Sequence, residues 1–167
     1  NAGTTNTLRT LGKPAGYIVF LGDALKAVFA VWIVRYLLFP GLGDVTKILE
    51  TVTALGVVIG HNYPFYMHFK GGKGIAATGG FMFALDGRIA LIAAIVFAVV
   101  FFTTRYVSVG SLAITALFPI LMLIFYPGQW VVFGLSLVFT ALAWWRHRAN
   151  IKRLMNGTEN KFEKKKR

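Results

Sequence analysis

The sequence contains no cysteine among its 167 residues. Structural disulfides, thiolate metal sites and thioester-forming cysteine nucleophiles are therefore excluded. Three catalytic motifs are missing as well: the His-x4-Asp box of a large acyltransferase class, the Asp-x-x-Asp-Gly metal motif of lipid headgroup transfer, and the Gly-x-Ser-x-Gly nucleophile elbow. We accordingly expect neither a metal site nor a cofactor.

Acidic residues are scarce, with 6 Asp and Glu against 18 Lys and Arg, for a net charge of +12. In a soluble chain such an excess would suggest nucleic-acid binding. Here the cations flank long apolar runs, which the positive-inside bias of membrane proteins explains more directly. We therefore expect membrane lipids as partners and no nucleic acid.

Apolar residues make up 56% of the chain, and the mean hydropathy is +0.64. Because a helix rises ~1.5 Å per residue, about 20 apolar residues cross the ~30 Å hydrocarbon core of a bilayer. The pattern predicts one all-α domain over residues 1–167, a polytopic membrane helix bundle. Its runs cover residues 15–39, 48–61, 74–86, 89–104, 107–126 and 129–145, six spans or part-spans. The third run is short and rich in Gly and Ala, which is typical of packing inside a bundle or of re-entering the membrane.

The loops sort by charge onto two membrane faces. If each run crosses once, one face receives most of the basic residues, from the segments 1–14, 62–73, 105–106 and 146–167. The other face holds basic and acidic residues in equal number, namely Arg35, Lys47, Arg88, Asp44, Glu50 and Asp86. The asymmetry predicts that the basic face, with the tail from Arg146 onward, is cytoplasmic.

Three segments of the basic face combine small and cationic residues. They are NAGTTN with the Arg9 and Lys13 that follow it, GHNYPFYMHFKGGKG at 60–74, and RHRANIKR at 146–153. Glycine allows backbone N–H groups to approach an anion, and Lys and Arg make charge-assisted hydrogen bonds to phosphate. The pattern predicts a site for a phosphate-bearing substrate, with Gly71–Gly74 as an anion nest. Contact with lipid headgroups is the alternative interpretation of such loops.

Other polar residues are open to two interpretations. Asp23 and Lys26 are spaced i,i+3 within an apolar run, either as a functional pair or as a mutual ion pair. His147 and Asn150 share a helix face by the same spacing. Ser111 lies near the start of a span, where serine often bonds the preceding turn, and His61 precedes a Tyr-Pro break where it caps a helix end.

Taken in order, these motifs resemble the bacterial acyl-phosphate:glycerol-3-phosphate acyltransferases. The resemblance covers residues 1–159 and rests on N-x-G-x-T-N-x-x-R-x-L-G-K, D-x-L-K, G-H-x-x-P, F-K-G-G-K-G, R-Y-x-S-x-x-S and R-H-R-x-N-I-x-R-L-x-x-G. It implies a seven-helix enzyme of the bacterial inner membrane that makes lysophosphatidate from glycerol 3-phosphate and acyl phosphate, releasing phosphate. This reaction is the first committed step of bacterial phospholipid synthesis. The family's first motif usually reads G-S-G-N, of which only Asn1 stands here, so we expect a further helix upstream of an N-terminally truncated chain.

The resemblance also implies roles for residues. Arg9 would bind glycerol 3-phosphate, and Lys73 with the Gly71–Gly74 backbone would bind acyl phosphate. His147 is a candidate general base whose pKa we expect its arginine neighbours to depress, the substrate phosphate being the alternative proton acceptor. The implied catalytic residues are Lys73, Ser111, His147 and Asn150. The implied substrate-binding residues are Asn1, Gly3, Thr5, Asn6, Arg9, His61, Gly71, Gly72 and Gly74.

A covalent acyl-enzyme is not required, since phosphate is a good leaving group and positioning with charge stabilisation can supply most of the rate. An upstream acyl-phosphate-forming enzyme would be a further partner. Two alternatives remain: a transporter of an organic phosphate, and an acyltransferase that uses acyl-CoA or acyl carrier protein.

Overall fold

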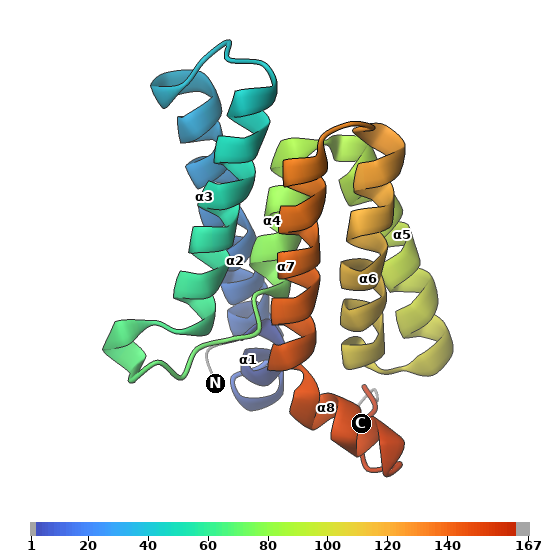
Figure 1. Cartoon of the computed structure of the whole chain (residues 1–167). Helices are drawn as coiled ribbons and strands as arrows, with labels where there is room; N and C mark the ends of the chain where they lie inside the picture. Colours follow the sequence, from blue (N-terminus) through green and yellow to red (C-terminus); the bar gives the residue numbers. More distant parts are fainter. Residues whose placement is uncertain (1–2, 163–167) are drawn as a thin grey trace.

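The computed structural model describes residues 3–162, and within that range the chain is built from helices and loops without strands (Figure 1). The prediction of an all-α fold is confirmed. The α-helices are α1 (Thr4–Thr10), α2 (Lys13–Ile33), α3 (Asp44–Asn62), α4 (Ile75–Leu85), α5 (Gly87–Thr104), α6 (Val107–Phe125), α7 (Trp130–Arg146) and α8 (Arg148–Met155). A π-helical turn, η1 (Val34–Leu38), extends α2, and a 3-10 turn, η2 (Phe65–Met67), lies between α3 and α4.

Each of the six predicted runs corresponds to one helix, from α2 to α7. Among the described residues, three stretches are long and apolar enough to cross a membrane by length and composition, namely Lys13–Leu38, α5 and α6, while α4 and α7 are shorter apolar helices. The second run begins earlier than predicted. It starts at Asp44 because Gly43 adopts a positive φ of 57° and Asp44 suits the electropositive first turn of a helix.

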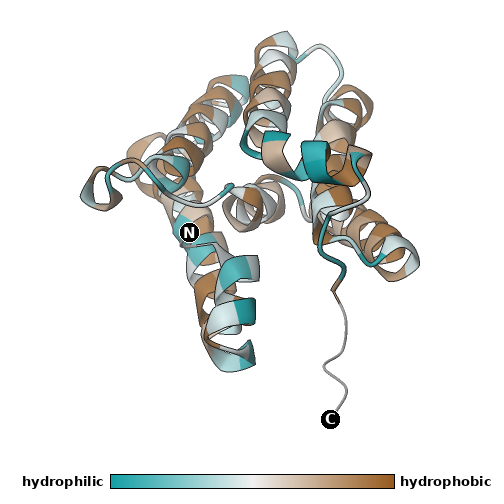
Figure 2. Ribbon diagram, turned by 90° about the horizontal axis from the view of Figure 1, so that it is seen from below, coloured by the Kyte–Doolittle hydropathy of each residue, from teal (hydrophilic) through white to brown (hydrophobic). Residues whose placement is uncertain are grey.

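The helices α2 to α7 run alternately in opposite directions, so that α1, the 63–74 loop and α8 gather at one end of the bundle (Figure 1). We call this the α1–α8 end. Two contacts tie its segments together: the Arg9 guanidinium donates to the Asn160 carbonyl at 3.4 Å, and the Phe162 amide donates to the Arg105 carbonyl at 2.8 Å. The loops predicted to share one face therefore do so. Seen from this end, hydrophilic segments stand out beside mostly apolar helices (Figure 2).

Helix α4 lies inside the bundle. Most of its residues are buried, and it continues from the 63–74 loop toward the opposite end of the bundle instead of turning back (Figure 1). Its Phe81 stacks on Phe139 of α7 with ring centroids 5.2 Å apart and meets Phe118 of α6 edge-on at 5.9 Å. The prediction that the run 74–86 packs inside the bundle is confirmed.

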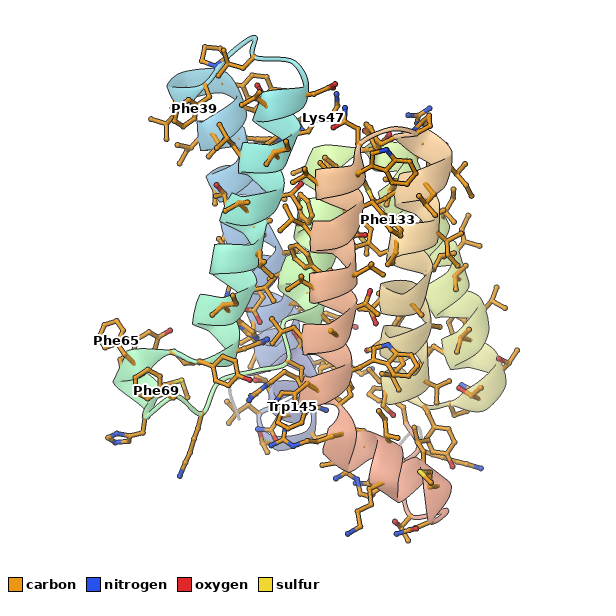
Figure 3. The ribbon with its side chains drawn as sticks, in the orientation of Figure 1. Phe39, Lys47, Phe65, Phe69, Phe133 and Trp145 are labelled. Carbon is orange, nitrogen blue, oxygen red and sulfur yellow. The ribbon has the colours of Figure 1, made fainter. Side chains whose placement is uncertain are left out.

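Apolar side chains also cover the outside of the bundle. Large residues such as Ile18, Leu91 and Ile124 are more than half exposed, as expected for helices in contact with lipid. Aromatic side chains project near both ends, with Phe39 at one and Phe65 and Trp145 at the other (Figure 3). This placement is typical of the aromatic belts at the two membrane–water interfaces.

The opposite end of the bundle contains a buried ion pair. The Arg35 guanidinium donates to both oxygens of Glu50 at 2.6 and 2.7 Å, and Glu50 is 1% exposed. Beside it lies a cavity of about 340 Å³ that Thr46, Lys47 and Tyr126 also line. Because the contact is bidentate, the pair joins η1 to α3 without leaving an unpaired buried charge.

The close packing of α2 against α4 generates a stability prediction. A Cβ atom at Gly80 would lie 2.2 Å from the carbonyl oxygen of Ala24, whereas nothing lies within 4 Å of one at Gly79. We expect Gly80→Ala to lower the free energy of unfolding by about 1–3 kcal/mol because the two helix backbones must separate. Gly79→Ala, the matched control, should be neutral or stabilising, since Ala favours helix over Gly by up to about 1 kcal/mol. Thermal unfolding in detergent measures both, and equal unfolding midpoints would contradict this packing.

Candidate functional site

The first two glycines of the GGKG segment, Gly71 and Gly72, are held against the C-terminal end of α3. The Gly71 amide donates to the Asn62 carbonyl at 3.2 Å, and the Gly72 amide donates to the His61 carbonyl at 3.1 Å. These N–H groups are therefore occupied by the protein's own backbone. The prediction of an anion nest is wrong for Gly71 and Gly72, because a phosphate would have to displace both carbonyls.

The glycines are required because the loop backbone lies very close to α3. A Cβ atom at Gly71 would lie 2.0 Å from the His61 carbonyl oxygen, and one at Gly72 would lie 2.0 Å from the His61 ring nitrogen Nε2. Gly74 has a positive φ of 79° at the start of α4, and a Cβ there would meet Val58 at 2.7 Å. The three glycines thus allow the loop to press onto α3, and their contact with a substrate remains a prediction.

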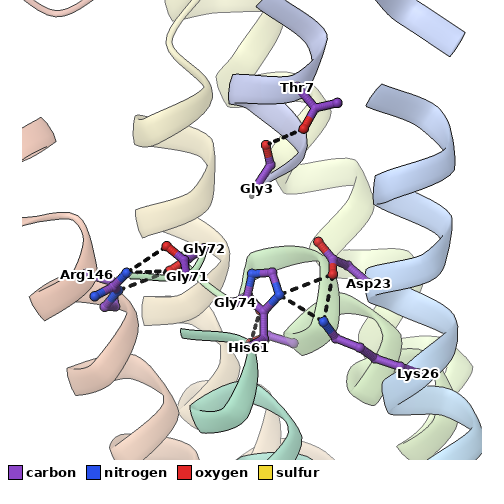
Figure 4. A network of polar contacts seen from close by, with 10 residues as sticks. Gly3, Thr7, Asp23, Lys26, His61, Gly71, Gly72, Gly74 and Arg146 are labelled. Carbon is purple, nitrogen blue, oxygen red and sulfur yellow. Dashed lines mark hydrogen bonds and ion pairs between the residues drawn. The ribbon is translucent and has the colours of Figure 1, made fainter. Parts of the chain in front are cut away.

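Arg146, at the end of α7, holds the same turn from the other side. Its Nη2 donates to the carbonyls of Gly71 at 3.0 Å and Gly72 at 2.8 Å, and its Nε donates to Gly72 at 3.1 Å (Figure 4). The guanidinium also lies over the Tyr63 ring, 4.8 Å from its centroid. Only the planar fork of arginine makes such a set of contacts. Our choice of site residues from the sequence omitted Arg146.

Lys73 follows this turn and reaches across to α8. Its Nζ donates to Oδ1 of Asn150 at 2.5 Å, so two predicted catalytic residues, 77 positions apart, are in contact. Burial is the main cause that lowers the pKa of Lys73, and the charges of Arg153, Arg9 and Arg146 lower it further while Glu159 opposes them. The crowding of cations shows that the site is electropositive, as an anion-binding site requires.

Glu159 joins the site from the segment after α8. Its carboxylate accepts hydrogen bonds from Asn150 at 2.7 Å, Ser108 at 3.0 Å and Arg153 at 2.7 Å, and its side chain is 6% exposed. Burial by itself would raise the pKa of Glu159, but these three hydrogen bonds together lower it. Sequence reasoning missed this residue, because a lone glutamate in a cationic tail gives only a weak signal.

His147 lies buried between α7 and α8, at 2% exposure. Its Nδ1 is 2.8 Å from the Ala143 carbonyl, which can only accept, so Nδ1 carries the proton and Nε2 keeps a lone pair. Burial first, and then the charge of Lys73, lower the pKa of His147 to about 4. The predicted direction is confirmed, but the arginine neighbours are not its main cause.

Ser111 is turned toward its own helix. Its hydroxyl donates to the Val107 carbonyl at 2.9 Å, which is the back-bonding alternative that the sequence left open. The hydroxyl that reaches the site network belongs to Ser108, one turn earlier. A catalytic role of Ser111 remains untested, and this geometry gives it no support.

Helix α1 brings the N-terminal segment to the same end. The Thr7 amide and hydroxyl both donate to the Gly3 carbonyl, at 3.1 and 3.3 Å, and the Thr10 hydroxyl donates to the Asn6 carbonyl at 3.0 Å. Thr5 is half-buried and Arg9 is exposed on this helix. Asn1 lies outside the described residues.

His61 contacts the pair formed by Asp23 and Lys26. Lys26 Nζ lies 2.7 Å from Asp23 Oδ1, which confirms the mutual ion pair that the i,i+3 spacing suggested. His61 Nδ1 lies 3.2 Å from Asp23 Oδ1 and 2.9 Å from Lys26 Nζ (Figure 4). His61 therefore links α3 to α2.

The comparisons with known proteins agree with one another. The model of the glycerol-3-phosphate acyltransferase family matches residues 1–157. The protein named glycerol-3-phosphate acyltransferase from Clostridioides difficile is 44% identical over 99% of this chain and 80% of its own length. Its namesake from Thermoanaerobacter sp. is 41% identical over 99% of this chain and 79% of its own length.

A solved structure shares the fold. It is a crystal structure of PlsY (YgiH), described as an integral membrane glycerol 3-phosphate acyltransferase in its glycerol 3-phosphate form. It superposes with a TM-score of 0.87 at 37% identity, covering 98% of this chain and 78% of its own. This chain therefore belongs to the glycerol-3-phosphate acyltransferase family and is an integral membrane acyltransferase.

Proposed function

We propose that the protein transfers an acyl chain from acyl phosphate to the 1-hydroxyl of glycerol 3-phosphate, giving lysophosphatidate and inorganic phosphate. The observation that carries the proposal is the part-buried contact of Lys73 with Asn150, beside His147 and among the cations Arg9 and Arg146. Both substrates carry phosphate, and an electropositive site of this kind suits two phosphate groups. The family membership and the glycerol 3-phosphate form of the related crystal structure support glycerol 3-phosphate as the acceptor.

The hydroxyl groups near the site favour direct transfer over an acyl-enzyme. The chain has no cysteine, and the hydroxyls of Ser108 and Ser111 donate to Glu159 and to the Val107 carbonyl. Neither pairs with a histidine in the way that an activated nucleophile requires. The acceptor hydroxyl then attacks the acyl carbon itself, which calls for a donor with a good leaving group, such as acyl phosphate.

Lys73 and Arg9 take different phosphates in this proposal. Arg9 on the exposed face of α1 binds the phosphate of glycerol 3-phosphate, and Lys73 stabilises the phosphate that leaves the donor. Asn150 holds the Lys73 ammonium in place and contributes a polar contact to the same region. The bond from the acyl carbon to the phosphate oxygen breaks as the new ester bond forms, and the phosphate departs with that electron pair.

The proton of the acceptor hydroxyl passes to phosphate. A phosphate monoester has a second pKa of roughly 6, so it is a stronger base than an imidazole whose pKa is about 4. His147 Nε2 instead accepts a hydrogen bond from the neighbouring 2-hydroxyl of glycerol 3-phosphate, which orients the acceptor so that its 1-hydroxyl can attack. We place the site at the cytoplasmic face of a bacterial inner membrane, where an acyl-phosphate-forming enzyme supplies the donor.

A donor comparison tests the function. Purified protein in lipid vesicles receives glycerol 3-phosphate with acyl phosphate, acyl-CoA or acyl carrier protein carrying the same chain, and radiolabelled lysophosphatidate is measured. We expect product from acyl phosphate alone. Product only from the thioesters would overturn the donor assignment, and uptake of glycerol 3-phosphate without any product would favour a transporter.

Removing the Arg9 guanidinium tests the acceptor contact. A hydrogen bond to a charged group contributes about 1.5–3 kcal/mol, so Arg9→Ala should raise KM for glycerol 3-phosphate roughly 10- to 100-fold. KM for the donor should change little. The matched control is Arg148→Ala, since the Arg148 guanidinium is exposed and lies over Trp145, 4.6 Å from the ring centroid. Unchanged kinetics in Arg9→Ala would contradict the assignment.

The protonation state of His147 gives a pH prediction. Because burial lowers its pKa to about 4, the folded protein should keep this ring neutral at pH 7 and at pH 5.5, and protonate it only as the pH falls through about 4. Nitrogen-15 NMR of histidine-labelled protein, with His147→Asn to assign the signal, should show a neutral ring with the proton on Nδ1. A ring that titrates between pH 6 and 7 without substrate would contradict the structure.

A further inference from the structure

Three ionisable side chains meet within the bundle close to the site, and the proposed reaction uses none of them directly. Asp23 and Lys26 come from α2, and His61 comes from α3 (Figure 4). The Asp23 and His61 side chains are 13% and 8% exposed. Ionisable groups in a membrane protein are costly to bury, so a cluster of this kind requires a reason beyond packing.

The opposite edge of the His61 ring faces the GGKG turn. A Cβ atom placed on Gly72 would lie 2.0 Å from His61 Nε2, 2.7 Å from Cε1 and 3.0 Å from Cδ2. The nearest neighbours of Gly72 in that direction are therefore all atoms of the His61 ring. The backbone carbonyl of His61 also accepts a hydrogen bond from the Gly72 amide at 3.1 Å, so His61 contacts Gly72 through both its ring and its backbone.

The turn is held on its other side by Arg146, which binds the carbonyls of Gly71 and Gly72. His61 and Arg146 thus confine Gly72 between them, and Lys73 is the next residue along the chain. The Lys73 ammonium in turn contacts Asn150 across the site. A rotation of the His61 ring would release one of the two surfaces that confine the backbone next to Lys73.

We propose that Asp23 and Lys26 are positioning residues for acyl transfer, which act by fixing the His61 ring against Gly72 and thereby placing Lys73. Asp23 and Lys26 both approach Nδ1, so they set the orientation of the ring and present its Nε2 edge to the turn. Their effect on the reaction is transmitted through His61. The proposal rests on the role of Lys73 in the proposed function. It gives His61 a supporting place instead of direct contact with substrate.

The expected effect is large because reacting groups tolerate little displacement. A shift of about 1 Å in a positioned group costs on the order of 100-fold in rate. We therefore expect Gly72→Ala to lower kcat by about that factor, because its new methyl group collides with the His61 ring. His61→Ala should cost less, on the order of 10-fold, since the turn keeps its backbone hydrogen bonds and its contacts with Arg146.

The decisive experiment combines the two substitutions. Removing the ring makes room for the methyl group, so the double variant His61→Ala, Gly72→Ala should be roughly 10-fold more active than Gly72→Ala alone, close to the level of His61→Ala. Gly71→Ala is the matched control. Its Cβ would strike the His61 carbonyl oxygen at 2.0 Å, a backbone atom, so His61→Ala should not rescue it. The proposal would be overturned if the loss of kcat in the double variant equalled the product of the two single losses, or if His61→Ala alone were inactive.

Asp23→Asn provides a second test that adds no volume. It should lower kcat with little change in either KM, and it should have no further effect when His61 is already alanine. The control is Asp44→Asn, which breaks another i,i+3 pair, with Lys47, at the opposite end of the bundle. If Asp23→Asn lowered kcat by the same factor in the wild-type protein and in His61→Ala, Asp23 would have only a structural role.

Both tests use whichever donor supports turnover in the wild-type protein, so an error in the donor assignment leaves them intact. Lys73→Met is assayed alongside. If it retains full activity, the proposed site fails independently of the outcome for His61. Thermal unfolding in detergent accompanies each variant and separates a change in kcat from a loss of folded protein.

Discussion

The structure depends most on the close approach between the GGKG turn and the C-terminal end of α3. This approach is possible only without side chains, since a Cβ atom at Gly71 or Gly72 would lie 2.0 Å from His61. The absence of side chains lets two amides reach the last carbonyls of α3, which a helix otherwise leaves without partners. Lys73 is thereby attached to the bundle at a defined place, although it lies in a loop between membrane helices. A half-buried ammonium needs such support, because a mobile backbone would let it turn into water.

Lys73 and Arg146, two cations of the candidate site, are held by neutral acceptors. Arg146 binds two carbonyl oxygens, which are neutral, and Lys73 binds the amide oxygen of Asn150. Glu159 pairs with Arg153 and reaches Lys73 only through Asn150. Neutral acceptors hold a cation without cancelling its charge, so Lys73 and Arg146 still contribute positive potential. A carboxylate placed directly on Lys73 would remove the attraction for an anionic substrate.

Much of this arrangement was predictable from the sequence, and the failures have physical causes. The six apolar runs correspond to α2–α7, and the charge asymmetry correctly predicted which segments lie at one end of the bundle. Both predictions succeeded because the patterns are local and repeat along the chain. The short helices α1 and α8 are polar and carry no such pattern. The prediction of an anion nest at Gly71 and Gly72 was wrong because a glycine indicates that some group approaches the backbone closely, but does not identify that group. Glu159 was missed because a single carboxylate in a basic tail gives a weak signal, and Arg146 because the carbonyls that it binds lie 74 and 75 positions away in the sequence.

Direct transfer places a particular demand on such a scaffold. In the proposed transfer, which has no covalent intermediate, the protein would lower the barrier by bringing two anionic substrates together and stabilising the charge that develops on the leaving phosphate. The phosphates repel each other, so the protein must hold cations at fixed places before the substrates arrive. Hydrogen bonds to carbonyls, an amide and one buried carboxylate provide that rigidity here. The cluster of His61 with Asp23 and Lys26 follows the same principle, because an ion pair that is partly shielded from water keeps its orientation.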